Sequence, residues 1–109
     1  MISDTIAKLE AKLKDTSLSP RKRRELLELL NRLKTEVNTL SRTHRDEAES
    51  IAGFAEAATR EATRARKNPK LVDLSMQALT ASVAGFEKSH PRLVEVVNRI
   101  CTTLASLGI

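Results

Sequence analysis

Residues 37–51 read VNTLSRTHRDEAESI, and they decide the fold, because a helix either continues through them or turns back near Thr43. No Pro follows Pro20 up to residue 67, and the single Gly in this range, Gly53, does not forbid a helix, so a single helix of roughly 70 Å is compatible with the sequence. The alternative is a turn within residues 41–46, because Thr43 followed by Asp46 and Glu47 has the pattern of a helix cap with acidic residues in the first turn. We favour the turn, which gives two helices that pack side by side.

Apolar residues on both sides of this segment recur at heptad spacing. The first set is Leu26, Leu30, Leu33, Val37 and Leu40, and the second is Ala48, Ile51, Ala55, Ala58, Ala62 and Ala65. Such stripes are typical of helices that pack as in a coiled coil. The alanines make residues 46–67 a thin helix that lets its neighbours come close.

The three prolines mark further helix starts. Pro20, Pro69 and Pro91 each precede an amphipathic run, and proline is tolerated at the first helical position because its missing N–H has no intrahelical partner there. Ser19 and Asn68 are suitable caps. The expected helices are 4–15 with Ser3 as its cap, one starting at 20, 46–67, 69–87, and 91–107 ended by Gly108. The short link between the last two predicts an antiparallel hairpin.

The composition favours helices packed on helices. Among 109 residues the aromatic fraction is 2%, Trp and Tyr are absent, and the apolar residues are mainly Leu, Ala, Val and Ile. We therefore predict one all-α domain over residues 1–109, an up-down bundle of four or five helices with coiled-coil-like packing. No signal-peptide pattern and no stretch of roughly 20 apolar residues is present, so we expect a cytoplasmic protein with no membrane partner.

Chemistry-bearing motifs are absent from the sequence. It contains no nucleophile elbow, P-loop, Rossmann glycines, HExxH or paired CxxC. Cys101 is the only cysteine, and beside Ile100 it is interpreted as a small hydrophobe. His44 and His90 each follow a hydroxyl residue and precede a helix, so we interpret them as residues at helix starts rather than metal ligands or pH sensors. We expect no enzymatic activity, no cofactor, no metal and no small-molecule substrate.

A short internal echo, SIAGF at 50–54 and SVAGF at 82–86, places a glycine inside each of two predicted helices. Glycine costs about 1 kcal/mol there relative to alanine. We expect tight helix crossings at Gly53 and Gly85, with Phe54 and Phe86 filling the adjacent core; the alternative is a ligand that approaches the backbone.

Residues 85–109, GFEKSHPRLVEVVNRICTTLASLGI, resemble the end of a family of short bacterial proteins, domain of unknown function 4404. The positions that carry the resemblance are Phe86, Glu87, Ser89, His90, Pro91, Leu93, Gly108 and Ile109. It implies a small helical cytoplasmic protein and no particular activity. Members are often acidic in the middle, whereas this chain is basic there and has an additional Ala-rich helix.

Basic residues form two clusters in a chain of net charge +5. They are Arg21, Lys22, Arg23 and Arg24, and then Arg60, Arg64, Arg66, Lys67 and Lys70. If the chain turns near His44, position 22 lies opposite roughly position 66, and the clusters meet at one end of the bundle. They then form either a solvated face that keeps the protein soluble or a binding surface for an acidic protein or nucleic acid.

Self-association is the other expectation. Nearly every predicted helix has an apolar heptad stripe, and together these stripes present more apolar surface than one small bundle easily buries. The leading hypothesis is a non-enzymatic interaction or scaffold protein that forms a dimer or larger homo-oligomer. The alternative is an accessory basic protein that binds nucleic acid or another polyanion without sequence specificity.

Overall fold

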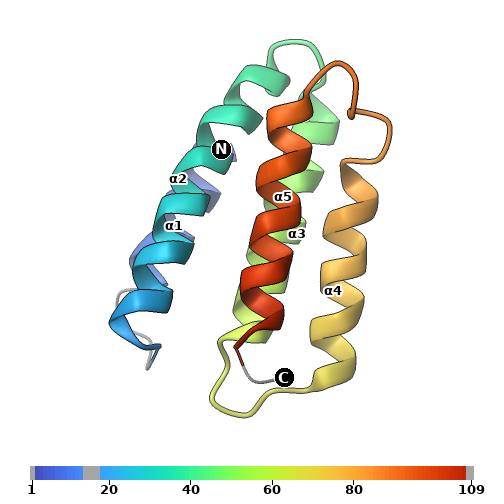
Figure 1. Cartoon of the computed structure of the whole chain (residues 1–109). Coiled ribbons are helices and arrows are strands. Elements are labelled where there is room, and N and C mark those ends of the chain that lie inside the picture. Colours follow the sequence, from blue (N-terminus) through green and yellow to red (C-terminus); the bar gives the residue numbers. More distant parts are fainter. Residues whose placement is uncertain (1, 14–17, 108–109) are drawn as a thin grey trace.

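The computed structural model describes residues 2–13 and 18–107, which form five helices (Figure 1). These are α1 (Ile2–Leu13), α2 (Pro20–Ser41), α3 (Arg45–Ala62), α4 (Pro69–Ser82) and α5 (Pro91–Ala105). No strand occurs in these two described segments, and the all-α prediction is confirmed. None of the helices is both long enough and apolar enough to span a membrane, within the same segments.

The chain turns back at residues 42–44, as favoured from the sequence. The backbone N–H of His44 donates to the carbonyl of Leu40 at 2.8 Å, and Asp46 and Glu47 lie in the first turn of α3. The single long helix is therefore excluded. The N-cap is His44 rather than Thr43, because the Thr43 hydroxyl is used locally, 2.8 Å from Nδ1 of His44 and 3.3 Å from the Leu40 carbonyl oxygen.

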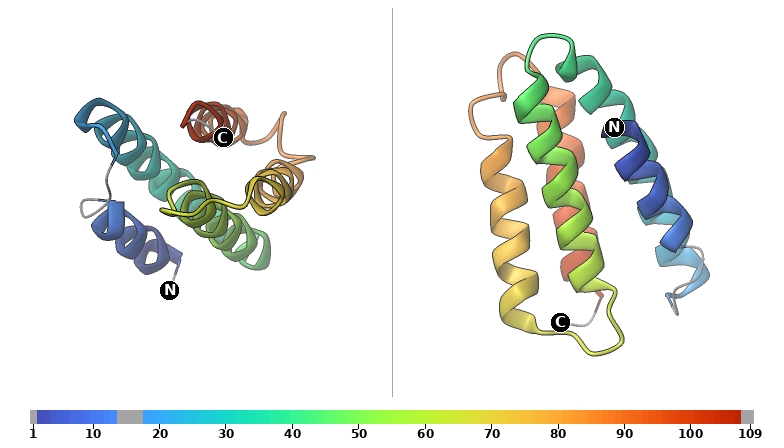
Figure 2. Two further views of the ribbon diagram at one scale, coloured as in Figure 1. Left: turned by 90° about the horizontal axis from the view of Figure 1, so that it is seen from below. Right: turned by 180° about the vertical axis from the view of Figure 1, so that it is seen from behind.

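Successive helices run alternately up and down, with α3 at the centre (Figures 1 and 2). Helix α3 contacts each of the other four helices, α5 packs mainly on α2, and α1 lies across α2 and α3. The predicted antiparallel hairpin of α4 and α5 is confirmed (Figure 1). The bundle thus has an upper end, which holds the 42–44 turn, and a lower end, which holds the link between α3 and α4.

The two predicted apolar stripes form the core. Leu26, Leu30, Leu33, Val37 and Leu40 are fully buried, as are Ala48, Ile51, Ala55, Ala58 and Ala62. Small alanine side chains allow four helices to surround α3. Ala65 is an exception, because α3 ends at Ala62 and Ala65 is exposed in the following loop.

Helix starts were predicted better than helix ends. Ser19 Oγ accepts from the N–H of Lys22 at 3.2 Å, and Asn68 Oδ1 accepts from the N–H groups of Lys70 and Leu71. Ser3, in contrast, lies within α1, which begins at Ile2. Helices α3, α4 and α5 end earlier than expected, at 62, 82 and 105. The predicted end of the first helix at 15 and the Gly108 cap lie outside the described residues.

The prediction of tight crossings at the two glycines is wrong. Gly85 lies beyond α4 with a φ of 96°, a conformation that glycine adopts without strain, and its N–H donates to the Glu87 carboxylate at 2.7 Å. A Cβ added at Gly53 would meet no atom within 4 Å. Phe54 does not fill the core, because its side chain is 38% exposed. Phe86 is half-buried and packs against the core.

Candidate functional site

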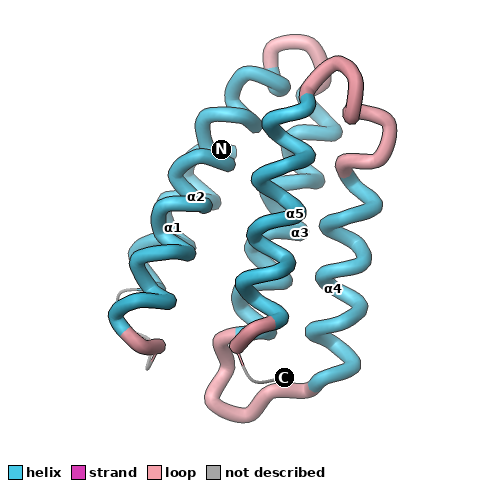
Figure 3. Tube along the Cα trace, viewed as in Figure 1, coloured by secondary structure: helices cyan, strands magenta, loops and turns pink. Residues whose placement is uncertain are grey.

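The antiparallel order of the helices brings the two predicted basic clusters to the lower end of the bundle. The start of α2, the end of α3, the loop after it and the start of α4 all lie there (Figures 1 and 3). This confirms the geometry that we expected from a turn near His44. We call the nine residues at this end the basic end: Arg21, Lys22, Arg23, Arg24, Arg60, Arg64, Arg66, Lys67 and Lys70.

Two lysines of the basic end bond the residues that directly follow α5. Lys22 Nζ donates to Ser106 Oγ at 2.8 Å, and Lys67 Nζ donates to the carbonyl of Leu107 at 2.7 Å. Helix α5 has no basic residue in its own last turn, and positive charge is favourable next to a helix C-terminus. These two lysines therefore have a structural role that fastens α5 to α2 and to the loop after α3.

Three arginines of the basic end are also held by neighbouring groups. Arg64 Nε lies 3.0 Å from Oε1 of Glu61, a side chain that is almost buried, and Arg60 pairs with Glu56 at 3.3 Å. Arg23 Nη2 donates to the carbonyl of Leu18 at 3.1 Å. Much of the positive charge at this end is thus engaged within the chain.

The side chains of Arg21, Arg24, Arg66 and Lys70 are different. All four are exposed, and they form no ion pair or hydrogen bond with any residue in the described part of the chain. They come from three separate elements: the first turns of α2, the loop after α3 and the start of α4. The N-termini of α2 and α4 add partial positive charge at the same end. This arrangement can bind an anion without breaking an internal contact.

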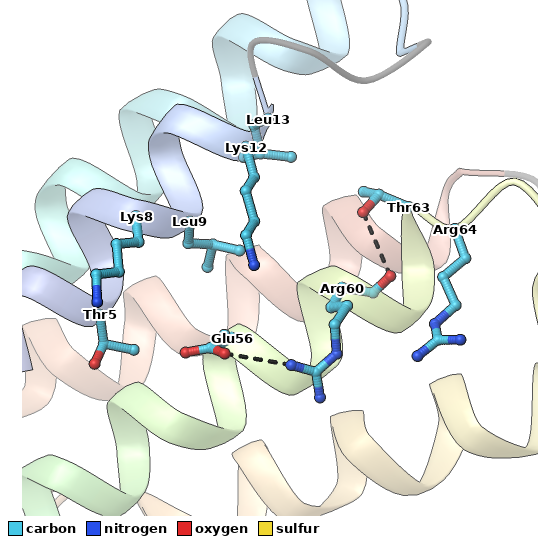
Figure 4. Close-up of a pocket in the computed structure, with 9 residues that line it drawn as sticks. All are labelled: Thr5, Lys8, Leu9, Lys12, Leu13, Glu56, Arg60, Thr63 and Arg64. Carbon is cyan, nitrogen blue, oxygen red and sulfur yellow. Dashed lines mark hydrogen bonds and ion pairs between the residues drawn. The ribbon is translucent and has the colours of Figure 1, made fainter.

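A pocket between α1 and α3, with a volume of about 280 Å³, was missed by sequence reasoning (Figure 4). It is lined by Thr5, Lys8, Leu9, Lys12, Leu13, Glu56, Arg60, Thr63 and Arg64. The sequence places Lys8 and Lys12 one turn apart beside Leu9 and Leu13. This spacing alone does not predict the pocket, because nothing local specifies the side on which α1 packs.

The two histidines meet at the upper end of the bundle, which sequence reasoning also missed. His44 and His90 are the N-caps of α3 and α5, and neither side chain makes a cap hydrogen bond. Their ring centroids are 6.4 Å apart, and each ring packs edge-to-face on Phe86. Nδ1 of each bonds the preceding hydroxyl, Thr43 or Ser89. Across the described ranges, no three His, Cys, Asp or Glu residues gather to hold a metal.

Cys101 lies away from both histidines. It is half-buried in α5, with Sγ 3.6 Å from Oγ1 of Thr80. Burial raises the pKa of the Cys101 thiol against a smaller opposing effect of the hydrogen bond with Thr80. His90 is about three helical turns away along α5. The raised pKa keeps the thiol protonated at neutral pH, and neither of the two histidines lies beside it to act as a base.

The fold and the basic end define a small all-α bundle with a positively charged end. Residues 26–109 match the family described as a domain of unknown function (DUF4404), and the chain belongs to this family. The matched segment contains the histidine pair and the basic residues from Arg60 to Lys70, while α1 and the cluster from Arg21 to Arg24 precede it. No curated protein and no solved structure matches the chain.

Proposed function

We propose that the chain is a non-enzymatic interaction protein that binds a polyanionic partner through the basic end. The observation that carries this proposal is the convergence of four exposed cations that have no side-chain partner among the described residues, Arg21, Arg24, Arg66 and Lys70. Arginines in the first turn of α2 oppose the helix dipole by roughly 0.3–1 kcal/mol each. Helix stability therefore gives no reason for Arg21 and Arg24, whereas an anionic partner does.

The mode of binding follows from the side chains available. Arginine guanidinium groups contact phosphates or carboxylates with paired N–H donors. The sequence has no Trp or Tyr on which bases could stack, so binding to nucleic acid would be independent of base sequence and sensitive to salt. The proposal places the protein in the cytoplasm, and the free thiol of Cys101 is compatible with that reducing compartment.

Replacing Arg21, Arg24, Arg66 and Lys70 together with Gln tests the basic end. We expect the parent to bind random duplex DNA at low salt, with affinity that falls steeply as salt increases. The variant should lose most of this affinity, and its slope of log K against log salt should be less steep by roughly 3 to 4, because each phosphate contact contributes about 0.9. Fluorescence anisotropy with a labelled duplex measures both quantities.

The matched control replaces Arg32, Arg42, Lys88 and Arg92 with Gln. These four side chains are also exposed and lie away from the basic end. Replacing them removes the same amount of positive charge as the first variant does. Equal losses in the two variants would mean that net charge alone drives binding. A parent that binds neither DNA nor RNA nor an acidic polypeptide at low salt would refute the proposal.

Self-association is a second candidate, supported by a different observation. The stripes on α2 and α3 that led to this expectation are buried within one chain, so they offer no interface. Instead, Leu71 and Leu74 are 46% and 49% exposed, about one turn apart on α4. We propose that two copies associate through this face, where these leucines would be removed from water.

Sedimentation velocity tests the self-association proposal. We expect the parent to form dimers at high micromolar concentration and the Leu71→Asp/Leu74→Asp variant to be monomeric with an unchanged helix content. Phe54→Asp, at another exposed apolar side chain, is the control and should leave the dimer intact. A parent that stays monomeric up to millimolar concentration would exclude self-association.

A further inference from the structure

We propose that the pocket between α1 and α3 binds an amphipathic anion, in which an alkyl chain ends in a carboxylate or a similar anionic headgroup. This site is separate from the four unpartnered cations of the basic end, although it includes Arg60 and Arg64. It therefore does not depend on the function proposed above. The chemistry of its floor and the charge at its rim define the ligand class.

The floor of the pocket is apolar. Leu9 and Leu13 are buried side chains of α1 that line it (Figure 4). A volume of about 280 Å³ is near the lower limit of small-molecule sites. This space suits a single alkyl chain of roughly eight to ten carbons better than a bulky ring system.

The rim of the pocket carries an excess of positive charge. Lys8 and Lys12 extend from α1, Arg60 extends from α3, and Arg64 extends from the loop after α3 (Figure 4). Glu56 lines the pocket and pairs with Arg60, and Glu61 on α3 pairs with both Arg60 and Arg64. Lys12 forms no ion pair with any described residue, and the acid that interacts with Lys8 is Asp4 on its own helix. The two arginines are therefore partly neutralised within the chain, and the cations available to a bound anion are chiefly Lys8 and Lys12 of α1.

On the side of α1 that faces α2, the helix pairs opposite charges. Towards α2, Glu10 pairs with Lys34, with Lys34 Nζ 3.0 Å from Oε1 of Glu10. Towards α3, the chain instead places Lys8 and Lys12 around the same pocket as two arginines. The two arginines have acidic partners on α3, whereas among the described residues no acid of α3 pairs with Lys8 or Lys12. An anionic headgroup would supply the negative charge that these lysines lack.

Decanoate is the probe, titrated into the isotope-labelled full chain and followed by NMR. We expect saturable shifts centred on Leu9, Leu13 and Thr63, with a dissociation constant below a millimolar. Acetate lacks the chain and decanol lacks the charge, so each should bind at least about tenfold more weakly. Dodecyl phosphate and decyl sulfate then distinguish the headgroups.

Two variants separate this pocket from the basic end. Lys8→Gln/Lys12→Gln should weaken decanoate binding by about fivefold or more and leave the helix content unchanged. Arg21→Gln/Arg24→Gln is the matched control, which should weaken DNA binding but not decanoate binding. If the lysine variant misfolds, the difference in affinity between decanoate and decanol for the parent protein tests whether the anionic group contributes to binding.

The proposal is overturned if decanoate shows no saturable binding at a few millimolar, if decanol binds equally well, or if the shifts lie along α4 and α5. Failure of DNA binding has no bearing on these outcomes, because Lys8 and Lys12 are not part of the basic end. The two proposals can therefore fail separately.

Discussion

Replacing Leu33 with Asp is expected to abolish cooperative folding. Leu33 is fully buried in α2 within the core cluster, and an unpaired carboxylate in such a place is strongly disfavoured. Loss of the leucine side chain alone costs about 2–5 kcal/mol, which is comparable with the total stability of about 5–15 kcal/mol of a small domain. Circular dichroism during heating should show no cooperative transition, and Leu33→Ala should show one at a much lower temperature.

Leu74→Asp is the control for this prediction. Leu74 is half exposed on α4, so the same chemical change should alter the free energy of unfolding by only about 0.5 kcal/mol. The comparison is made at low micromolar protein, where association through α4 contributes little. A cooperative, near-native melt of Leu33→Asp would mean that the apolar face of α2 is not in the core.

Ala55→Leu should destabilise the bundle by overpacking. Ala55 is fully buried in α3, which four other helices surround. Three additional carbon atoms require these helices to move apart, at a cost of about 1–3 kcal/mol or more. Leucine and alanine have similar helix propensities, so the loss reports on packing. Urea denaturation measures it.

Ala11→Leu provides the matched control, because Ala11 is exposed on α1. Its free energy of unfolding should change by no more than about 0.5 kcal/mol. Stability that is unchanged or increased in Ala55→Leu would reveal unfilled space beside α3 and would contradict the view of α3 as a thin central helix.

Helix starts could be predicted because their signals are local. Pro20, Pro69 and Pro91 mark their helices, and Ser19 and Asn68 cap theirs. Helix ends depend on where the chain must leave for the next element. After Ala62, the Thr63 hydroxyl bonds the Thr59 carbonyl at 2.7 Å and the loop crosses to α4, although the alanine pattern continues to Ala65.

The candidate site was predictable as a charge distribution but not as a set of contacts. Once the chain turns at 42–44, the two basic clusters must lie at one end. Which cations are engaged depends on partners far away in the sequence, such as Ser106 for Lys22 and Leu107 for Lys67. The histidine pair and the α1 pocket require the same tertiary information, because local patterns do not specify which helices become neighbours.

The bonds from Lys22 and Lys67 to Ser106 and Leu107, directly after α5, have a thermodynamic consequence. Lys22 stands between Arg21 and Arg24, and Lys67 follows Arg66, so docking of α5 helps to fix the spacing of the free cations. For the proposed partner, docking of α5 and binding would be linked equilibria. A partner that requires this spacing would favour the docked helix, and fraying of α5 would weaken the partner's affinity by the same free energy. If the basic end binds the proposed partner, α5 would influence that binding without contributing a charge to the surface.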